Sequence, residues 1–179
     1  MIKWLRRQQD SGPEVPVELG PKDRVLARQL EAGGCVVVAT LHELILLHPE
    51  RGELARRRWL EVDAGSWDSL TATISVTWVD GSRAAQWTFP EGSGVRFAEV
   101  FHDRVQASLI IDAPIQGPTR QLGKAAIRKD LCTDELVPQL IWSRGVRRGD
   151  SEAMAAGQSV LRSLAELVDL DLGSTGPVS

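Results

Sequence analysis

Two groups of arginines, each with a tryptophan beside it, are the residues best suited to binding chemistry in this chain of 179 residues. The first group is Arg56, Arg57, Arg58 and Trp59, and the second is Trp142, Arg144, Arg147 and Arg148. Arginine pairs with carboxylates and phosphates through its planar guanidinium, and it stacks on tryptophan rings. Each group could therefore form part of a surface that binds an anionic partner, although a solvated strand face and a solvated loop would have the same composition.

Histidines offer a second kind of chemistry, because a neutral imidazole ligates metals and transfers protons. His42 and His48 lie six positions apart in a strand-like run, so both side chains would point to the same side of a sheet. A metal site would need a third ligand and supporting contacts. The remaining histidine, His102, is expected on a helix beside Asp103. The sequence therefore predicts three unrelated histidines and no metal site.

Nucleophilic and acid–base sites are not indicated either. Cys35 directly precedes a hydrophobic run, which favours a buried, unreactive thiol. Gly92-Ser93-Gly94 resembles part of a phosphate-binding loop, but no lysine follows it, so a turn with Ser93 as a helix N-cap is predicted. Glu61 and Asp63 would share one side of a strand and are expected to be solvated. We predict no catalytic residue and no cofactor.

Charge and hydropathy exclude several classes of protein. The chain has 21 basic and 24 acidic residues, a net charge of −3, which is too balanced for nucleic-acid binding through bulk positive charge. The longest apolar runs, Cys35–Ala39 and Leu44–Leu47, are too short to cross a membrane, and no apolar stretch follows the basic start Met1–Arg7. Two distant cysteines, Cys35 and Cys132, suit a reducing compartment. We expect a cytoplasmic protein without an integral membrane segment.

Hydrophobic periodicity predicts that the first half of the chain is mainly β. Strands are expected over residues 24–30, 35–40, 43–47 and 56–63. Residues 65–68 are expected to form a loop or bulge. The strict alternation of residues 71–79, followed by Asp80-Gly81, predicts a hairpin with a type I′ turn and a returning strand over 82–89.

The second half is predicted to contain two amphipathic helices with strands between them. Apolar residues recur every four positions from Phe97 to Leu109, and residues 112–114, which include a proline, are expected to end that helix. After a loop, strands are expected over 121–129 and 136–143. A last helix is expected to begin with Asp150 or Ser151 as its N-cap and to extend to Val168.

The run CVVVAT of Cys35–Thr40, followed by LILL of Leu44–Leu47, resembles the second and third strands of bacterial pleckstrin-homology-like and GRAM-like domains. Trp59-Leu60-Glu61-Val62 is similar to the following strand, and residues 97–109 resemble the closing helix. The resemblance spans about residues 23–111. It implies a bent, seven-stranded antiparallel sandwich closed by a helix, in a family whose members mostly bind peptides, proteins or lipid headgroups and are not usually enzymes.

Two departures from the family pattern bear on the ligand. The first hairpin loop is Glu31-Ala32-Gly33-Gly34, where eukaryotic phosphoinositide binders carry basic residues. The predicted closing helix has Phe97 and Phe101 and lacks the tryptophan that many eukaryotic members carry there. Phosphoinositide binding is therefore not expected.

The predicted fold class is α+β, with an antiparallel bent sheet or half-barrel closed by an amphipathic helix and a C-terminal ββα addition. The expected organisation is an N-terminal arm or linker over residues 1–21, a β-rich domain over 22–112, the ββα addition packed on it over 113–172, and a disordered tail over 173–179.

Three functions are compatible with these observations. The favoured one is a non-catalytic interaction module that binds an unknown protein partner, or its own copies, through a sheet edge or the C-terminal helix. An alternative is a small-ligand-binding protein or enzyme with a site between the two parts, near Trp142, residues 144–148 and His48. A weaker alternative is peripheral membrane association through Met1–Arg7 and the arginines at 56–58.

Overall fold

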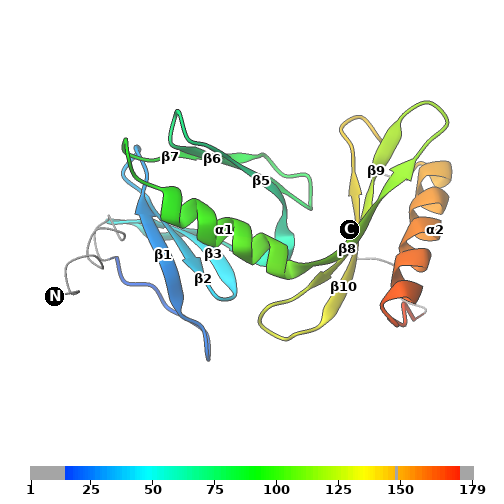
Figure 1. Cartoon of the computed structure of the whole chain (residues 1–179), viewed down its shortest axis with the longest axis horizontal. Helices are drawn as coiled ribbons and strands as arrows, with labels where there is room; N and C mark the ends of the chain where they lie inside the picture. The colour runs from blue at the N-terminus through cyan, green and yellow to red at the C-terminus, as the bar shows by residue number, and fades with distance from the viewer. Residues whose placement is uncertain (1–14, 148, 174–179) are drawn as a thin grey trace.

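The computed structural model describes residues 15–147 and 149–173, which form three antiparallel sheets and two α-helices (Figure 1). The first sheet has four strands in the order β1-β2-β3-β4. They are β1 (Val25–Leu30), β2 (Val36–Thr40), β3 (Glu43–His48) and β4 (Gly52–Arg58). The predicted α+β class with antiparallel sheets is confirmed, and the strands of the described residues form no closed barrel.

The second sheet has three strands in the order β5-β6-β7 and contains the predicted hairpin. The strands are β5 (Val62–Asp68), β6 (Thr73–Trp78) and β7 (Ala85–Thr88), and a 3-10 turn over Trp59–Glu61 leads into β5. The predicted strand over 56–63 is thus divided at this turn, and the predicted loop over 65–68 belongs to β5.

The turn of the hairpin differs from the type I′ prediction. Gly81 N donates to Trp78 O at 3.1 Å, so Val79 and Asp80 lie at the centre of the turn. A type I′ turn needs positive φ at both central residues. Here Gly81 has a φ of 71° and Asp80 is not in the positive-φ region. The register of β6 and β7 is nevertheless the one that a two-residue turn at Asp80-Gly81 would give, with Ile74 opposite Trp87.

Helix α1 (Val95–Ser108) packs between the first two sheets (Figure 1). Its predicted apolar stripe is buried, with Phe97, Phe101 and Val105 in one core cluster with residues of both sheets. The predicted N-cap is wrong, because Gly94 occupies that position with a φ of 86° and Ser93 Oγ instead donates to Pro90 O at 2.6 Å. A Cβ on Gly94 would lie 2.4 Å from the Phe89 ring, so both the conformation and the packing require glycine there.

The C-terminal part is a separate sheet of three strands, in the order β10-β9-β8, covered on one face by α2. Its elements are β8 (Leu109–Gln116), β9 (Gln121–Lys129), β10 (Leu136–Trp142) and α2 (Ser151–Leu167), whose N-cap is Asp150. Residues 109–116 were expected to end α1 and to begin a loop, but α1 ends at Ser108 and β8 begins at the next residue. The addition is therefore βββα, and its first strand starts before the predicted boundary at residue 112.

Polar contacts join the third sheet to the rest of the molecule. Gln139 Nε2 donates to Leu60 O at 3.0 Å, and Arg58 forms an ion pair with Asp130 at 2.7 Å. The third sheet consequently has α2 on one face and part of the first half of the chain on the other. The predicted arm over residues 1–21 and tail over 173–179 lie mostly outside the described residues.

Replacing Gly123 by alanine tests the packing of this sheet. A Cβ on Gly123 of β9 would lie 2.2 Å from Ile141 O on β10, and a backbone atom cannot move aside without disturbing the strand pairing. We expect the free energy of unfolding to fall by about 3 kcal/mol, as measured by urea denaturation followed by circular dichroism. The control is Gly20→Ala, which has no atom within 4 Å of the new Cβ and should change stability by less than about 0.5 kcal/mol. Equal stabilities of the two variants would contradict this packing.

Candidate functional site

A cavity of about 290 Å³ lies where β5, α1 and the third sheet meet. Residues 63–67 of β5 form one wall, and α1 contributes Phe101, His102 and Val105 to the opposite wall. The third sheet contributes Lys124 and Arg128 of β9. We call this space the β5–α1 groove. It has apolar walls and a charged end, which is the usual composition of a site that binds an organic ligand.

Gly65 allows α1 to pack closely against β5 in the groove. A Cβ at this position would lie 2.2 Å from the Phe101 ring, so the ring packs directly against the strand backbone. The ring of Trp67, two residues further along, stacks on Phe89 with centroids 6.0 Å apart. Gly65 itself is exposed and Trp67 is half-buried.

One edge of β5 is unpaired, and the register identifies the backbone groups that it presents. Phe89 N donates to Ala72 O at 2.8 Å, so every second residue of β6 from Ala72 directs its backbone groups to β7. The intervening residues direct theirs to β5, where Ser75 lies opposite Ser66. The N–H and C=O groups of Gly65 and Trp67 therefore point away from β6. Among the described residues no strand pairs with this edge.

The edges of the third sheet are protected by proline. Proline cannot donate to a ladder, and on an edge strand it discourages pairing with another chain. The edge strands β8 and β10 contain Pro114 and Pro138, respectively. No proline, lysine or arginine occurs in β5.

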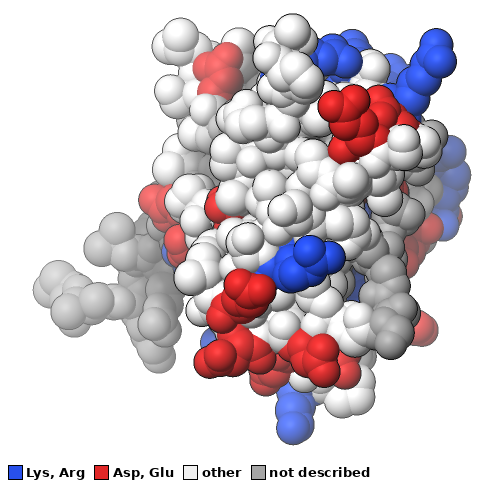
Figure 2. Space-filling model, turned by 90° about the vertical axis from the view of Figure 1, so that its right-hand side faces the viewer, with Lys and Arg blue, Asp and Glu red and all other residues white. Residues whose placement is uncertain are grey.

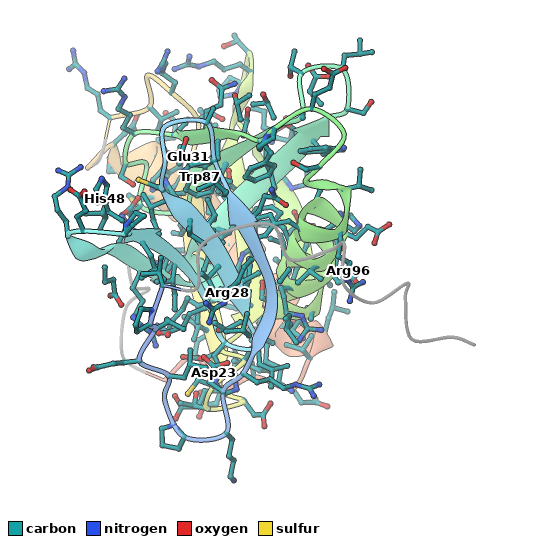
Figure 3. All side chains as sticks on the ribbon, turned by 90° about the vertical axis from the view of Figure 1, so that its left-hand side faces the viewer. Asp23, Arg28, Glu31, His48, Trp87 and Arg96 are labelled. Atoms are coloured by element: carbon teal, nitrogen blue, oxygen red, sulfur yellow. The ribbon has the colours of Figure 1, made fainter. Side chains whose placement is uncertain are left out.

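The edges of the first sheet and of β7 are protected in other ways. The edge strand β4 carries three arginines at residues 56–58, and charged side chains also discourage pairing. The end of β1, marked by Glu31, lies beside β7, marked by Trp87, in Figure 3, and Ala32 N donates to Thr88 O at 2.7 Å. On β1 itself, Arg28 donates to Val15 O at 3.1 Å. The free edge of β5 carries Asp63, Asp68 and a β-bulge between Val62 and Ala64, but its central residues 64–67 have neither charge nor proline.

Arg128 closes one end of the groove and is 1% exposed. Its guanidinium donates to Ser108 Oγ at 3.1 Å and to Asp63 O at 3.0 Å. Burial lowers the pKa of Arg128, and the negative charges of Asp63 and Asp112 oppose this shift. Beside it, Lys124 Nζ lies 2.7 Å from Asp63 Oδ1 and 3.9 Å from an oxygen of Asp112. This end therefore holds two cations at the junction of the two halves.

No protein-family model matches the sequence, and neither does any curated protein. The shape and charge of the β5–α1 groove are therefore the observations from which a function can be inferred.

The first arginine group does not form a free basic surface. Arg56 pairs with Glu43 and Glu53, and its hydrogen bond with Glu53 is the largest cause of its raised pKa. Arg57 pairs with Glu61 and Asp80, each at about 3 Å, and Arg58 pairs with Asp130. Trp59 is 0% exposed and donates from Nε1 to Thr40 O at 3.1 Å. Neutralised arginines and a buried tryptophan leave little for an anionic partner to contact.

The structure describes three of the four residues of the second arginine group. Trp142 is half-buried and packs on α2, where a Cβ on Gly157 would lie 2.8 Å from its ring. Arg144 and Arg147 are exposed, whereas Arg148 lies outside the described residues. Figure 2 looks onto the face that carries α2, and there the basic groups of the described residues are separated by acidic and uncharged ones.

The histidines do not come together. His42 lies 3.8 Å from Asp23, and His48 ends β3, where its Nδ1 accepts the N–H of Glu50 at 3.2 Å. His102 is exposed and lines the β5–α1 groove, a position that its surroundings in the sequence do not indicate. In the part of the chain that the structure describes, no group of three or more His, Cys, Asp or Glu could hold a metal ion.

The described residues include no helix long and apolar enough to cross a membrane.

The structure also shows the environments of Cys35 and Asp63, two residues that the sequence offers as candidates for chemistry. Cys35 is half-buried, and burial is the largest cause of its raised pKa, with Glu31 adding to the shift. A raised pKa reduces the fraction of reactive thiolate. Asp63, expected to be a solvated acid, instead lies in the charged end of the groove with Lys124. The sequence pattern does not indicate Lys124 or Arg128 as site residues.

Proposed function

We propose that this protein is a non-catalytic interaction module that binds an extended segment of a partner protein as an additional strand along β5. The observation that carries the proposal is the unpaired edge of β5 beside the β5–α1 groove. In this mode of recognition, main-chain hydrogen bonds supply affinity, and pockets for alternate side chains supply specificity. The backbone groups of Gly65 and Trp67 would form the new ladder.

The groove suits the side chains that such a strand would present. Neighbouring strands lie about 4.8 Å apart, and successive side chains point to opposite faces. Every second side chain of the bound segment would therefore point toward α1, where the largely buried side chains of Phe101 and Val105 line the groove. The remaining side chains would face solvent beside Ala64 and Ser66, which are exposed.

The resemblance to pleckstrin-homology-like domains is part of the same proposal. The resemblance implies seven strands and a closing helix, and it is supported by the order of β1 to β7 followed by α1. Peptide binding is among the common functions of that family. A cytoplasmic location, expected from the two distant cysteines, suits a partner that is also intracellular.

The second candidate function is the binding of a small molecule between the two halves. It is supported by the position of the cavity, which both halves line. Its volume of about 290 Å³ is at the lower end of the range for small-molecule sites, about 300 to 1,000 Å³. Trp142, residues 144–147 and His48 do not line it, so this candidate would use Lys124, Arg128 and Asp63 instead. Peripheral membrane association is less favoured, because acidic partners neutralise Arg56, Arg57 and Arg58.

Peptides selected from a random library on the full chain test strand addition. N-methylation removes a backbone donor and adds bulk at that edge of the peptide. Methylating alternate residues in one register should abolish binding, because those amides face β5, whereas methylating the other register should leave binding within about threefold. Binding is measured by fluorescence anisotropy. Equal tolerance of both registers, or a library that yields no specific peptide, would contradict the proposal.

A pair of variants on α1 controls for the location. Gln106 is exposed and lines the groove, so Gln106→Trp should obstruct it and weaken peptide binding at least tenfold. The next residue, Ala107, is exposed but does not line the groove, so Ala107→Trp should bind like the unmodified protein. If both variants bind equally well, the peptide binds elsewhere.

A further inference from the structure

We propose that the charged end of the β5–α1 groove is a binding site for a carboxylate, supplied by an acidic side chain or by the C-terminus of the bound segment. This inference rests on the strand-addition function and identifies the chemistry of its ligand. Its starting point is Arg128, a cation that is 1% exposed and lines the groove.

Arg128 is buried without a carboxylate in direct contact. Both of its described hydrogen bonds go to neutral oxygens, Ser108 Oγ and Asp63 O, and its Nε has no hydrogen-bond partner. Among the described residues, no carboxylate oxygen lies within ion-pair distance of its guanidinium. Fully buried arginines are almost always paired, because the loss of hydration must be compensated. An anionic ligand group would provide that compensation.

Lys124 provides a second donor at the same end. Its ammonium pairs with Asp63 at 2.7 Å and is farther from Asp112, at 3.9 Å. An ammonium has three N–H donors, so it can bind a further oxygen while it keeps the contact with Asp63. The groove lining at this end holds two cations and one carboxylate, and Asp112 stands outside the lining.

The position of Arg128 relative to β5 places the anion at an end of the added strand. The guanidinium of Arg128 donates a hydrogen bond to Asp63 O. This carbonyl lies on the unpaired side of β5, two residues before Gly65. An added strand that pairs with Gly65 and Trp67 cannot continue past Asp63 in the same ladder. Its last paired residue therefore meets Arg128 and Lys124, and with about 3.4 Å per residue the anionic group belongs one or two residues beyond the one opposite Gly65.

The donor set fits a carboxylate better than a phosphate. Arg128 Nε and Lys124 Nζ together offer one donor group for each of two oxygens. A phosphate monoester carries about −1.5 to −2 charges and three acceptor oxygens at neutral pH. Its larger charge would be repelled more strongly by Asp63 and Asp112.

Titration of the full chain with sodium acetate, followed by NMR of the arginine Nε–Hε signals, tests the site without any peptide. We expect the Arg128 signal to shift at lower acetate concentrations than the signals of Arg144 and Arg147, which are exposed and report non-specific binding. In Lys124→Met the affinity for acetate should fall about tenfold, because one charge-assisted hydrogen bond is lost. Lys129→Met, on the same strand but outside the groove, should bind acetate like the unmodified protein. A response of Arg128 no earlier than that of the exposed arginines would overturn the proposal, as would equal losses in both lysine variants.

Two further experiments distinguish a failure of the carboxylate site from a failure of the strand-addition function on which it rests. Inorganic phosphate in place of acetate should bind more weakly, and tighter binding of phosphate would overturn the choice of a carboxylate. Among selected peptides, amidation of the C-terminus and Glu→Gln or Asp→Asn changes identify the source of the carboxylate. Peptides that bind along β5 with neither group would leave strand addition standing and overturn the carboxylate site. Acetate binding at Arg128, in a protein for which no peptide can be selected, would leave the carboxylate site standing and overturn strand addition.

Discussion

Trp59→Ala is expected to lower the free energy of unfolding by about 4 kcal/mol, as measured by urea denaturation with far-ultraviolet circular dichroism. Trp59 is 0% exposed, and its ring meets Phe101 edge-on with centroids 5.7 Å apart. Alanine would leave a large cavity in the core that joins the first two sheets to α1. It would also leave Thr40 O without the indole donor that lies 3.1 Å away.

A second substitution at the same position separates the two contributions. Trp59→Phe keeps most of the aromatic packing and removes the N–H donor, so it should cost about 2 kcal/mol. The sequence pattern placed Trp59 on an exposed surface, for which the loss on changing to alanine would be at most about 0.5 kcal/mol. A loss that small would show that the tryptophan is not in the core.

Arg128→Ala is expected to destabilise the protein by about 4 kcal/mol, because it leaves a cavity and removes the donor groups that hold Ser108 and Asp63. Arg128→Met should cost about 1 kcal/mol, since methionine fills much of the same volume. A buried cation without a direct carboxylate partner contributes little to stability through its charge in the unliganded protein. Both losses are measured by urea denaturation in an acetate-free buffer.

The comparison of the two Arg128 variants is the informative result. If Met is tolerated and Ala is not, Arg128 stabilises the unliganded protein through its volume, and its charge is free to serve a ligand. If Met is as harmful as Ala, the attraction of Asp63 and Asp112 for the guanidinium stabilises the fold, and no anionic ligand is needed to compensate the buried charge.

Elements with a single strong periodicity were predictable from the sequence. The four-residue spacing of Phe97, Phe101 and Val105 indicated α1, and the alternation of residues 73–78 indicated β6. Both signals depend on one buried face. At Leu109 two signals overlap, because the leucine continues the helical stripe and also begins the β-branched run of β8. The sequence around Pro114 predicts the end of a helix, whereas the proline lies within β8 and is tolerated there because β8 is an edge strand.

The β5–α1 groove could not be predicted from sequence patterns, for two physical reasons. Its walls come from β5, α1 and β9, which are adjacent only after three sheets have formed. Its charged end depends on a buried arginine, while composition rules place arginine at the surface. A local 3-10 turn has a similar effect at Trp59, because the strand β4 ends at Arg58 and its alternation therefore does not show that the Trp59 ring turns into the core. The partial signal that was available is the alternation of Lys124, Ala126 and Arg128, which puts both cations on one face of β9.

The direct passage from α1 into β8 has a mechanical consequence. Ser108 ends the helix and Leu109 begins the strand, so the halves are joined by a single peptide bond with no hinge between them. A rotation of one half against the other would have to change the backbone at Ser108 and Leu109 and break the contacts that Arg128 and Gln139 make across the junction. We therefore expect the orientation of the third sheet relative to α1 to be restricted by this short connection, together with the hydrogen bonds of Arg128 and Gln139 across the junction.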